Sequence, residues 1–227
     1  MTWKNLFTKG NRYYETENGI LYCGDCLEIM KGFPNGSVNL VVTDPPYGIR
    51  KKEKWDKKEI FFRNIDKWIN TCYRITQTVV IWFCSGRHIY YALKNNIDIY
   101  HRLLIWNKPP GSQFSGAMNT NIWYSIEPIL VFAKKVPKTN KQKKYGYASF
   151  SYRTVSSKKY NHPTTKPLGL MEDLIYFYSN ENNLVLDPFI GTGTTAVASE
   201  RLNRRWIGIE INKSYCEVVK KRLENEL

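Results

Sequence analysis

The stretch NLVLDPFIGTGTTAVASERLNRRWIGIE, residues 183–210, carries the strongest signal for the fold of this chain. Its apolar run at 184–187 is short and rich in aliphatic residues, which is typical of a buried parallel strand. A loop with two glycines, Gly191 and Gly193, follows, then a helical stretch and a second strand that ends at Glu210. Glycines at such a turn let the backbone bend sharply and let a ligand approach closely. The stretch therefore predicts a strand–loop–helix–strand unit of an open α/β sheet.

The spacing within this unit predicts a nucleoside-binding site. Glu210 follows Gly191 by 19 residues (210 − 191), which is the spacing at which dinucleotide-binding folds place an acid on a ribose. A carboxylate there can accept hydrogen bonds from both ribose hydroxyls of an adenosine. No GK[ST] ending follows, so the loop is not a P-loop. The alternative is an ordinary strand-to-helix turn with a solvated acid, and the combined features favour the cofactor loop over it.

The alternation of short buried strands with helices extends over the rest of the chain. It predicts a single α/β domain over 1–227, with a mostly parallel sheet and helices on both faces. Residues 19–32 are expected to form a strand, a tight turn and the start of a helix. Further strands are expected at 38–44, 79–83, 103–106 and 129–132, and helices at 59–73, 168–179, 194–202 and 213–225.

A second motif, Asp44-Pro45-Pro46-Tyr47, ends the predicted strand 38–44. The carboxyl ends of strands form the usual ligand-binding edge of an open sheet. The Asp44 carboxylate and a backbone carbonyl held rigidly by the prolines could accept both N–H groups of a nucleobase amine, which would aim its lone pair at a methyl group. Tyr47 could stack on a base rotated out of the duplex. The alternative is a proline-stiffened turn that carries an exposed tyrosine.

The charge of the chain predicts a polyanionic partner. Lys and Arg number 34 against 20 Asp and Glu, which gives a formal net charge of +14. Nucleic acid is the usual partner of such a protein, and an anionic membrane is the alternative. No apolar run approaches the ~20 residues of a membrane span, and the first ten residues lack an apolar signal core. A cytoplasmic, DNA-binding protein is therefore expected, without a membrane association.

Two basic clusters flank the proposed site in the sequence, at 50–58 and 134–144. We expect them to neutralise phosphates, with a solvated lysine-rich surface as the alternative. The second cluster belongs to a polar segment at about 134–161 with little hydrophobic periodicity, which is interpreted as an extended basic insertion. The lysines expected to contact DNA are Lys51, Lys52, Lys54, Lys135, Lys138, Lys141, Lys143 and Lys144.

The five cysteines do not predict a disulfide framework, because their number is odd. Cys23 and Cys26 form a lone CxxC, and a zinc site needs two further ligands at suitable spacing. No metal site is therefore expected. His88 and His101 are interpreted as surface or packing residues, and His162 as part of a turn.

Three motifs together resemble one enzyme family. TDPPYGI (43–49), HPTTKP (162–167) and DPFIGTGTTAVASERLNRRWIGIEIN (187–212) are similar to the beta group of amino-methylating DNA methyltransferases. In that group the DPPY motif precedes the cofactor loop, a permuted order, and many members belong to restriction-modification systems. The resemblance extends from about Leu21 to the C-terminus. It implies the Rossmann-like fold of S-adenosylmethionine-dependent methyltransferases. It also implies an enzyme that acts on double-stranded DNA and flips the target base out of the helix.

The resemblance also implies roles for individual residues. Asp44 to Tyr47 would form the target-base pocket, which residues 105–111 and Glu127 would border. Many relatives carry a His where Ile126 stands here, so no role is assigned to that position. For the cofactor, S-adenosyl-L-methionine, it implies contacts from Asp25 and Phe189 near the adenine, Glu210 on the ribose, Thr164 and Lys166 at the amino-acid end, and Asp187, Gly191, Gly193 and Thr194 along the loop.

The sequence favours adenine N6 as the methylated atom, since N4-cytosine enzymes of this family more often carry Ser at the position of Asp44. N4-cytosine methylation is a second hypothesis, with the same fold. Methylation of RNA or of a protein glutamine is a third, and a catalytically silent DNA-binding subunit is a fourth. The resemblance implies that the insertion at about 134–161 is the target-recognition region. Because this insertion is short, either recognition is short and loose or a separate recognition subunit contributes to it. A separate nuclease and a homodimer are further partners that the resemblance implies.

Overall fold

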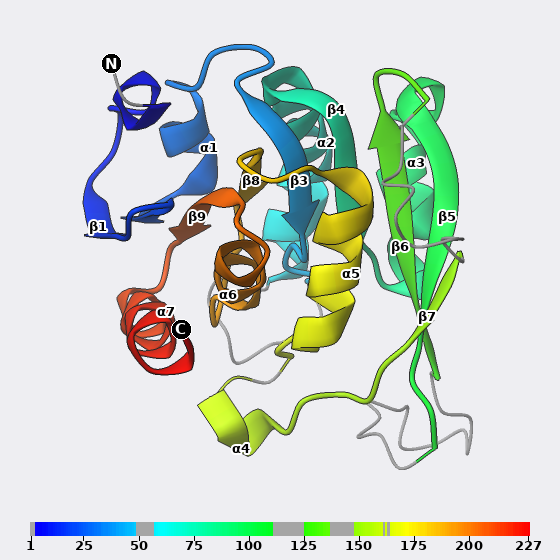
Figure 1. Cartoon of the computed structure of the whole chain (residues 1–227). Helices are drawn as coiled ribbons and strands as arrows, with labels where there is room; N and C mark the ends of the chain where they lie inside the picture. Colours follow the sequence, from blue (N-terminus) through cyan, green and yellow to red (C-terminus); the bar gives the residue numbers. More distant parts are fainter. Residues whose placement is uncertain (1–2, 49–56, 111–124, 137–147, 161, 163) are drawn as a thin grey trace.

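The computed structural model describes residues 3–48, 57–110, 125–136, 148–160, 162 and 164–227. Its centre is a single mixed sheet with helices on either side (Figure 1). The strands of the described residues are β1 (Arg12–Glu15), β2 (Gly19–Cys23), β3 (Val38–Thr43), β4 (Thr76–Phe83), β5 (Tyr100–Asn107), β6 (Ile126–Ala133), β7 (Ser149–Ser151), β8 (Leu184–Asp187) and β9 (Arg205–Glu210).

The strands follow the order β1-β2-β9-β8-β3-β4-β6-β5-β7 across the sheet. The five neighbours from β2 to β4 run parallel to one another. Strand β6 is antiparallel to both of its neighbours, β4 and β5, and β1 is antiparallel to β2. The mostly parallel α/β sheet expected from the sequence is confirmed.

Helices cover both faces of this sheet, as the continuous apolar runs of the strands require. The helices are α1 (Cys26–Met30), α2 (Lys58–Ile75), α3 (Ile89–Leu93), α4 (Ser157–Tyr160), α5 (Leu168–Tyr178), α6 (Thr194–Arg201) and α7 (Lys213–Glu226), with short 3-10 turns η1 (Trp3–Leu6), η2 (Gly86–His88) and η3 (Ile97–Ile99).

Strand β3 shows how the two cores divide the side chains. Val41 points into the core beneath α1, α2 and α3, which also holds Trp68. Its neighbours Leu40 and Val42 point into the opposite core, beneath α5. Helices α6 and α7 close a third cluster against β2 and β9. Since successive residues of a strand point to opposite faces, a strand buried on both sides has to be apolar throughout.

The chain reverses its direction of winding between β3 and β8. These two strands are hydrogen-bonded neighbours. From β3 the chain crosses over to β4 on one side, and from β8 it crosses over to β9 on the other side. Such a switch point leaves a crevice outside the carboxyl ends of the two strands, where open α/β sheets bind ligands. Asp44 follows β3 directly and Asp187 ends β8, so both motifs reach this crevice.

The predicted helices and strands are confirmed, and two strands were missed. Strand β1 is short, and β7 lies within the polar insertion at 134–161, pairing with the edge strand β5. The described part of that insertion also holds α4. No helix among the described residues is long and apolar enough to cross a membrane. The single-domain organisation and the recognition role of the insertion stay predictions.

Candidate active site

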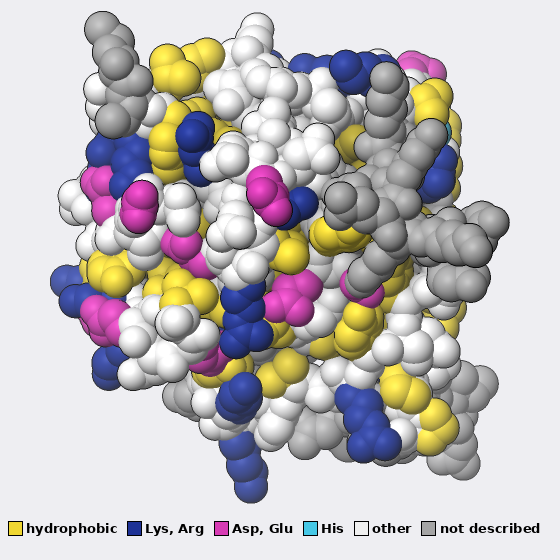
Figure 2. Space-filling view, in the orientation of Figure 1, with side chains coloured by type: hydrophobic (Ala, Val, Ile, Leu, Met, Phe, Trp, Pro, Cys, Tyr) yellow, Lys and Arg dark blue, Asp and Glu magenta, His cyan; other side chains and the backbone are white. Residues whose placement is uncertain are grey.

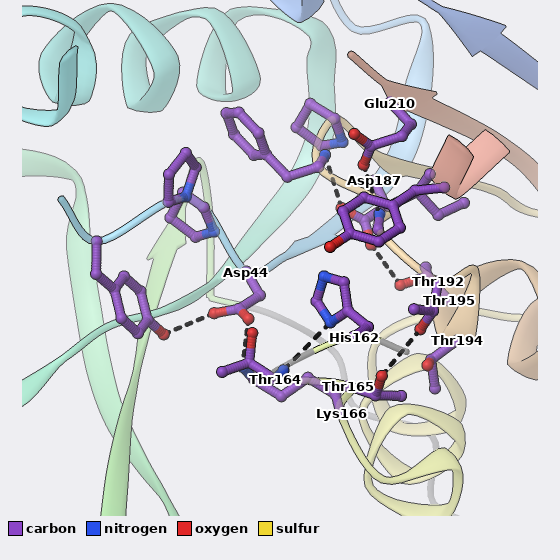
Figure 3. A pocket seen from close by; sticks show the side chains of 18 of the residues that line it. Asp44, His162, Thr164, Thr165, Lys166, Asp187, Thr192, Thr194, Thr195 and Glu210 are labelled. Atoms are coloured by element: carbon purple, nitrogen blue, oxygen red, sulfur yellow. Dashed lines mark hydrogen bonds and ion pairs between the residues drawn. The ribbon is translucent and has the colours of Figure 1, made fainter. Parts of the chain in front are cut away.

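One cavity of about 930 Å³ opens at the carboxyl ends of the parallel strands. Both sequence motifs line it, although they are more than a hundred residues apart in the chain. Figure 3 shows Asp44 on one side of this cavity and Asp187, Thr192 and Thr195 on the other. The cofactor loop after β8 and the DPPY motif after β3 therefore line the same cavity, as expected at a switch point.

The loop between β8 and α6 depends on glycine at two positions. Gly191 and Gly193 have φ angles of +53° and +83°, in the left-handed region that favours glycine. A Cβ at Gly193 would also lie 2.9 Å from Cγ1 of Val219 on α7. The loop therefore turns tightly into the buried N-terminus of α6, which brings its backbone N–H groups to the cavity wall.

Asp187 anchors this loop from below. Its Oδ1 accepts hydrogen bonds from Thr43 Oγ1 at 2.7 Å and from Phe189 N at 3.1 Å, and its Oδ2 accepts from Thr195 Oγ1 at 2.5 Å. The bond from Thr43 joins β8 to β3, so this carboxylate ties the two halves of the site together. Burial raises its pKa to about 6 against the effect of these hydrogen bonds. The sequence assigned Asp187 to the cofactor, and the structure shows that it also shapes the loop.

Glu210 presents a buried carboxylate to the cavity. Its Oε2 accepts from Gly191 N at 3.0 Å and its Oε1 from Asn212 N at 2.7 Å. Burial raises its pKa to about 7, because two backbone donors compensate only part of the lost hydration. Each carboxylate oxygen can accept a second hydrogen bond, so Glu210 fits a ligand that donates two hydroxyl groups. These residues fit the ribose of an adenosyl cofactor.

An apolar slot lies beside Glu210. Phe189 contacts Trp68 of α2 edge to face, with ring centroids 5.0 Å apart, and both line the cavity. Asp25 reaches the same wall because β2 pairs with β9, opposite Glu210. Its Oδ1 caps α1 by accepting from Leu27 N and Glu28 N. The slot suits a flat heteroaromatic ring, and the sequence did not identify Trp68.

The side of the cavity that holds Asp44, called the base side because the resemblance implies the target base there, has a second, denser set of charges. The Tyr47 hydroxyl lies 2.6 Å from Asp44 Oδ1 and 3.1 Å from Glu127 Oε1. Lys166 Nζ binds Asp44 Oδ2 and lies 3.1 Å from Glu127 Oε1. Lys108 Nζ binds Glu127 Oε2 at 2.8 Å. Two carboxylates and two ammonium groups therefore form one neutral network around the tyrosine.

Burial and ion pairing compete within this network. Burial raises the pKa of Asp44, although Lys166 opposes the shift. Burial also acts to raise the pKa of Glu127, but the ammonium groups of Lys166 and Lys108 outweigh it and lower that pKa. The pKa of Lys166 is raised, since its two carboxylate partners outweigh its own burial. Glu127 therefore holds its negative charge more firmly than Asp44 does.

The resemblance implies that Lys166 approaches the amino-acid end of the cofactor, and this stays a prediction. In the structure its ammonium lies on Asp44 and Glu127. Two carboxylates within reach of one ammonium attract it strongly in a buried site. Thr164, in the same motif, lines the cavity and donates from its backbone N to His162 Nδ1 at 3.2 Å.

Behind the loop, Arg222 of α7 holds the first turn of α6. Its Nη1 donates to Thr192 O at 2.9 Å and to Thr194 Oγ1 at 3.1 Å. Thr194 is buried, so its hydroxyl serves this contact within the fold. The guanidinium also lies 4.0 Å from the ring centroid of Tyr160 on α4. Arg222 thereby links the cofactor loop to the end of the insertion.

Several lining residues escaped the sequence analysis. Glu127 was noted as bordering the pocket but was given no role, and Lys108 was part of a quoted segment without one. His162 lines the cavity besides making its turn, and its ring lies 4.7 Å from that of Tyr215. Residues 105–111 and Glu127 were named as bordering the pocket, so the segments that hold both side chains were identified. That Lys108 and Glu127 lie side by side follows only from the antiparallel pairing of β5 with β6.

The predicted DNA-contacting lysines are mostly outside the described residues. Lys135 is described and is exposed just after β6. On the face shown in Figure 2, basic side chains are scattered among acidic ones and do not gather into one patch. The remaining lysines of this prediction, which lie outside the described residues, are Lys51, Lys52, Lys54, Lys138, Lys141, Lys143 and Lys144.

The described cysteines are all free thiols. Cys26 is buried, and burial raises its pKa well above the ordinary value, which makes it a poor nucleophile and a poor metal ligand. Across the part of the chain that the structure describes, no group of three or more His, Cys, Asp or Glu side chains could hold a metal ion.

Comparisons with known proteins agree on one kind of enzyme. A family model described as DNA methylase, N6_N4_Mtase, matches residues 38–221. The chain is similar to the type II methyltransferase M.HinfI of Haemophilus influenzae, with 32% identity over 88% of this chain and 67% of the relative. The type II methyltransferase M.HpaI of Haemophilus parainfluenzae is 29% identical over 91% of this chain and 74% of its own length.

Solved structures show the same likeness. The M1.HpyAVI–SAM complex superposes with a TM-score of 0.71 at 30% identity, over 89% of this chain and 98% of that chain. PvuII DNA methyltransferase, described as cytosine-N4-specific, superposes with a TM-score of 0.78 over 96% of this chain and 91% of its own. Its identity of 22% shows a shared fold alone.

Proposed function

The chain belongs to the N6/N4 family of DNA methylases, whose methyl donor is S-adenosyl-L-methionine, and within that family we propose that it methylates the N6 amino group of adenine in double-stranded DNA. The observation that carries the proposal is the Asp44 carboxylate at the end of β3, which faces the same cavity as the cofactor loop at the end of β8. An acceptor for an amino group and a site for a methyl donor thus share one space.

The cofactor half of the cavity supports binding of an adenosyl group. Glu210 would accept hydrogen bonds from the ribose hydroxyls, and Phe189 with Trp68 would contact the adenine beside Asp25. Gly191 keeps the wall of the cavity free of a side chain. When bound, S-adenosyl-L-methionine supplies a methyl group on a positively charged sulfur. The described residues Asp187, Gly193, Thr194 and Thr164 would complete this side of the site.

Asp44 would do the chemical work on the base. An exocyclic amine is a poor nucleophile, because its lone pair is delocalised into the ring. A carboxylate that accepts an N–H bond shifts the nitrogen toward tetrahedral geometry and directs its lone pair at the methyl carbon. The amine would take the methyl group with formation of a nitrogen–carbon bond and breakage of the carbon–sulfur bond, and it would then lose one proton to solvent. Pro45 and Pro46 fix the backbone, and Tyr47 positions the Asp44 carboxylate.

The depth of the site supports base flipping. Asp44 keeps 22% of its side-chain surface exposed and Glu127 keeps 12%. A base that is stacked and paired within a duplex cannot reach a carboxylate in such a recess. The base would therefore rotate out of the helix and enter the cavity. The cavity of about 930 Å³ is large enough for a nucleobase next to a cofactor.

Adenine is proposed over cytosine because N4-cytosine enzymes of this family more often carry Ser at the position of Asp44. The Asp44 carboxylate would accept one N–H of the target amino group, and a backbone carbonyl held by the prolines would accept the other. Several similar relatives are named as type II methyltransferases, which supports a place in a restriction-modification system. The basic segments at 50–58 and 134–144 would contact phosphates. A homodimer and a separate nuclease or recognition subunit are proposed partners.

The test is methyl transfer from labelled S-adenosyl-L-methionine to unmethylated duplex DNA, with mass spectrometry of the digested nucleosides. N6-methyladenine is the expected product. N4-methylcytosine would overturn the choice of base while leaving the methyl-transfer role intact. Cofactor binding without any methylated nucleoside, on genomic DNA that offers every short target, would overturn the proposal in favour of a silent DNA-binding subunit.

A further inference from the structure

Both oxygens of Asp44 already have donors within the protein. Tyr47 donates toward Oδ1 at 2.6 Å, and the ammonium of Lys166 binds Oδ2. A target amino group would need the same carboxylate as its acceptor. Lys166 also offers N–H groups to Asp44, the kind of donor that an exocyclic amine offers. The lysine therefore makes with Asp44 the kind of contact that a substrate amine would make.

A second carboxylate lies within reach of the same ammonium. Lys166 Nζ lies 3.1 Å from Glu127 Oε1, and Glu127 is itself held by Lys108 at 2.8 Å. Because Glu127 is fixed by a second cation and by the start of β6, it can keep Lys166 ion-paired without Asp44. Lys166 also lies over the Phe83 ring, 5.0 Å from its centroid, a contact that favours a cation at this spot.

We propose that Lys166 is a placeholder for the target amino group: its ammonium occupies Asp44 before the base binds and withdraws onto Glu127 when the base enters. This inference rests on the proposed function and assigns positioning roles to two residues outside the DPPY motif. No proton is transferred in the exchange, since both carboxylates and both ammonium groups keep their charges. Glu127 is thus the carboxylate that keeps Lys166 ion-paired once Asp44 is released.

The charges around the pocket favour such an exchange over a fixed ion pair. The ionisable groups that interact with Asp44 are Tyr47, Cys84, Glu127, Lys166 and Asp187, and Lys108 is ion-paired with Glu127. With both lysines present, the two carboxylates are neutralised before and after the exchange. Without Lys166, two carboxylates would share one lysine, and one of them would take up a proton in this recess. A protonated Asp44 presents a hydroxyl to the amine, which is the wrong partner for an N–H donor.

Three variants separate the placeholder from a structural ion pair. Lys166→Met, Glu127→Gln and the double variant are compared with the parent in single-turnover methylation of unmethylated genomic DNA at about pH 7 and pH 9. Lys31→Met serves as the matched control, since Lys31 forms an exposed ion pair with Glu28 and neither residue lines the pocket. Circular dichroism and S-adenosylhomocysteine affinity report whether each variant is folded.

Lys166→Met is expected to lose activity at pH 7 and to regain part of it at pH 9, because loss of the ammonium raises the pKa of Asp44 and a higher pH favours its ionised form. Glu127→Gln is expected to raise the DNA concentration at half-maximal single-turnover rate by about tenfold or more at both pH values, because Lys166 stays on Asp44. The double variant should then be more active than Glu127→Gln, since the retained lysine is gone. A double variant no better than Glu127→Gln overturns the inference, because a structural ion pair predicts further loss.

A binding measurement decides the inference without turnover. Saturation-transfer NMR with 2′-deoxyadenosine and S-adenosylhomocysteine at about pH 9 compares Glu127→Gln with the double variant. Removal of Lys166 should strengthen nucleoside binding by about fivefold or more. Equal binding, including none by either variant, overturns the placeholder. If the parent methylates no DNA while this difference is observed, the proposed function fails and the placeholder stands as a property of the pocket.

Discussion

The two halves of the cavity stabilise their buried carboxylates differently, one by neutral hydrogen-bond donors and the other by ion pairs. On the cofactor side, Asp187 and Glu210 are satisfied by hydroxyl and backbone N–H donors, and no lysine or arginine of the described residues pairs with either. On the base side, Asp44 and Glu127 are paired with Lys108 and Lys166. One half is left electronegative and the other is neutral.

This difference matches the charges of the two ligands. S-adenosyl-L-methionine brings a positively charged sulfonium, so a half with uncompensated carboxylates favours its approach. A nucleobase is neutral, and a pocket with a net charge would hold water more tightly and resist its entry. A buried carboxylate without a cationic partner favours binding of a cationic ligand, whereas an ion-paired carboxylate is compatible with binding of a neutral one.

The largest expected effect separates the two halves. Asp44→Ala should lower single-turnover methyl transfer by roughly a hundred- to a thousandfold, because the amine loses its acceptor. Affinity for S-adenosylhomocysteine should change by less than about twofold, since the cofactor contacts lie on the other side. Labelled transfer and calorimetry measure the two quantities, with Glu28→Gln as a surface control. Equal activity of the variant and the parent would end the assignment of Asp44.

The next effect should appear on the opposite side. Glu210→Ala should weaken S-adenosyl-L-methionine binding by roughly ten- to a hundredfold, because charged hydrogen bonds contribute ~1.5–3 kcal/mol. Methyl transfer at saturating cofactor should fall much less. Calorimetric titration and initial rates over a range of cofactor concentrations measure this split. A loss of rate with unchanged cofactor affinity would move Glu210 out of the cofactor site.

A backbone change tests whether the cofactor half depends on its tight loop. Gly193→Ala should destabilise the protein by about 1–3 kcal/mol, since it places a Cβ at a φ of +83° and 2.9 Å from Val219. Gly86→Ala is the matched control, because among the described residues, chain neighbours aside, no atom lies within 4 Å of a Cβ at Gly86. Thermal unfolding of both variants gives the comparison. Equal melting temperatures would show that the loop relaxes freely.

The smallest expected effect is a pH dependence of the free energy of unfolding that arises from Glu210. Burial raises the pKa of Glu210 to about 7 from an ordinary value of 4.5. Because the folded state then holds the proton more tightly than the unfolded state, this group makes stability fall as the pH rises from 4.5 to about 7. Glu210→Gln should therefore gain stability relative to the parent across that window, as measured by denaturant titrations at several pH values.

Titration of Glu210 should also be measurable as a proton released when the cofactor binds. Ribose hydroxyls donate to the carboxylate form, so binding should release part of a proton between about pH 6 and 7. Calorimetry in buffers of different ionisation enthalpy measures this release, and Glu210→Gln should abolish most of it. Equal proton release by the variant and the parent would assign the titration to Asp187, whose pKa of about 6 lies nearby.

Sequence patterns were sufficient for the parts of the site that lie on parallel strands. Asp44 and Glu210 each end an apolar run, and in a parallel sheet all such ends meet at one edge. Local patterns were therefore enough to predict both motifs, the glycine loop and the helices that follow it. Strand β7 escaped because three residues in a polar segment carry too weak a pattern to predict a strand.

The base-side charges depend instead on how distant segments are brought together. Glu127 belongs to the start of β6, and it reaches the active edge only because β6 runs antiparallel to β4, which puts its start beside the end of β4. The ammonium of Lys166 lies on Asp44 and Glu127 because the fold brings two carboxylates together within its reach. A sequence specifies which groups a strand end carries, whereas strand direction and the competition among nearby charges depend on how the whole sheet is assembled.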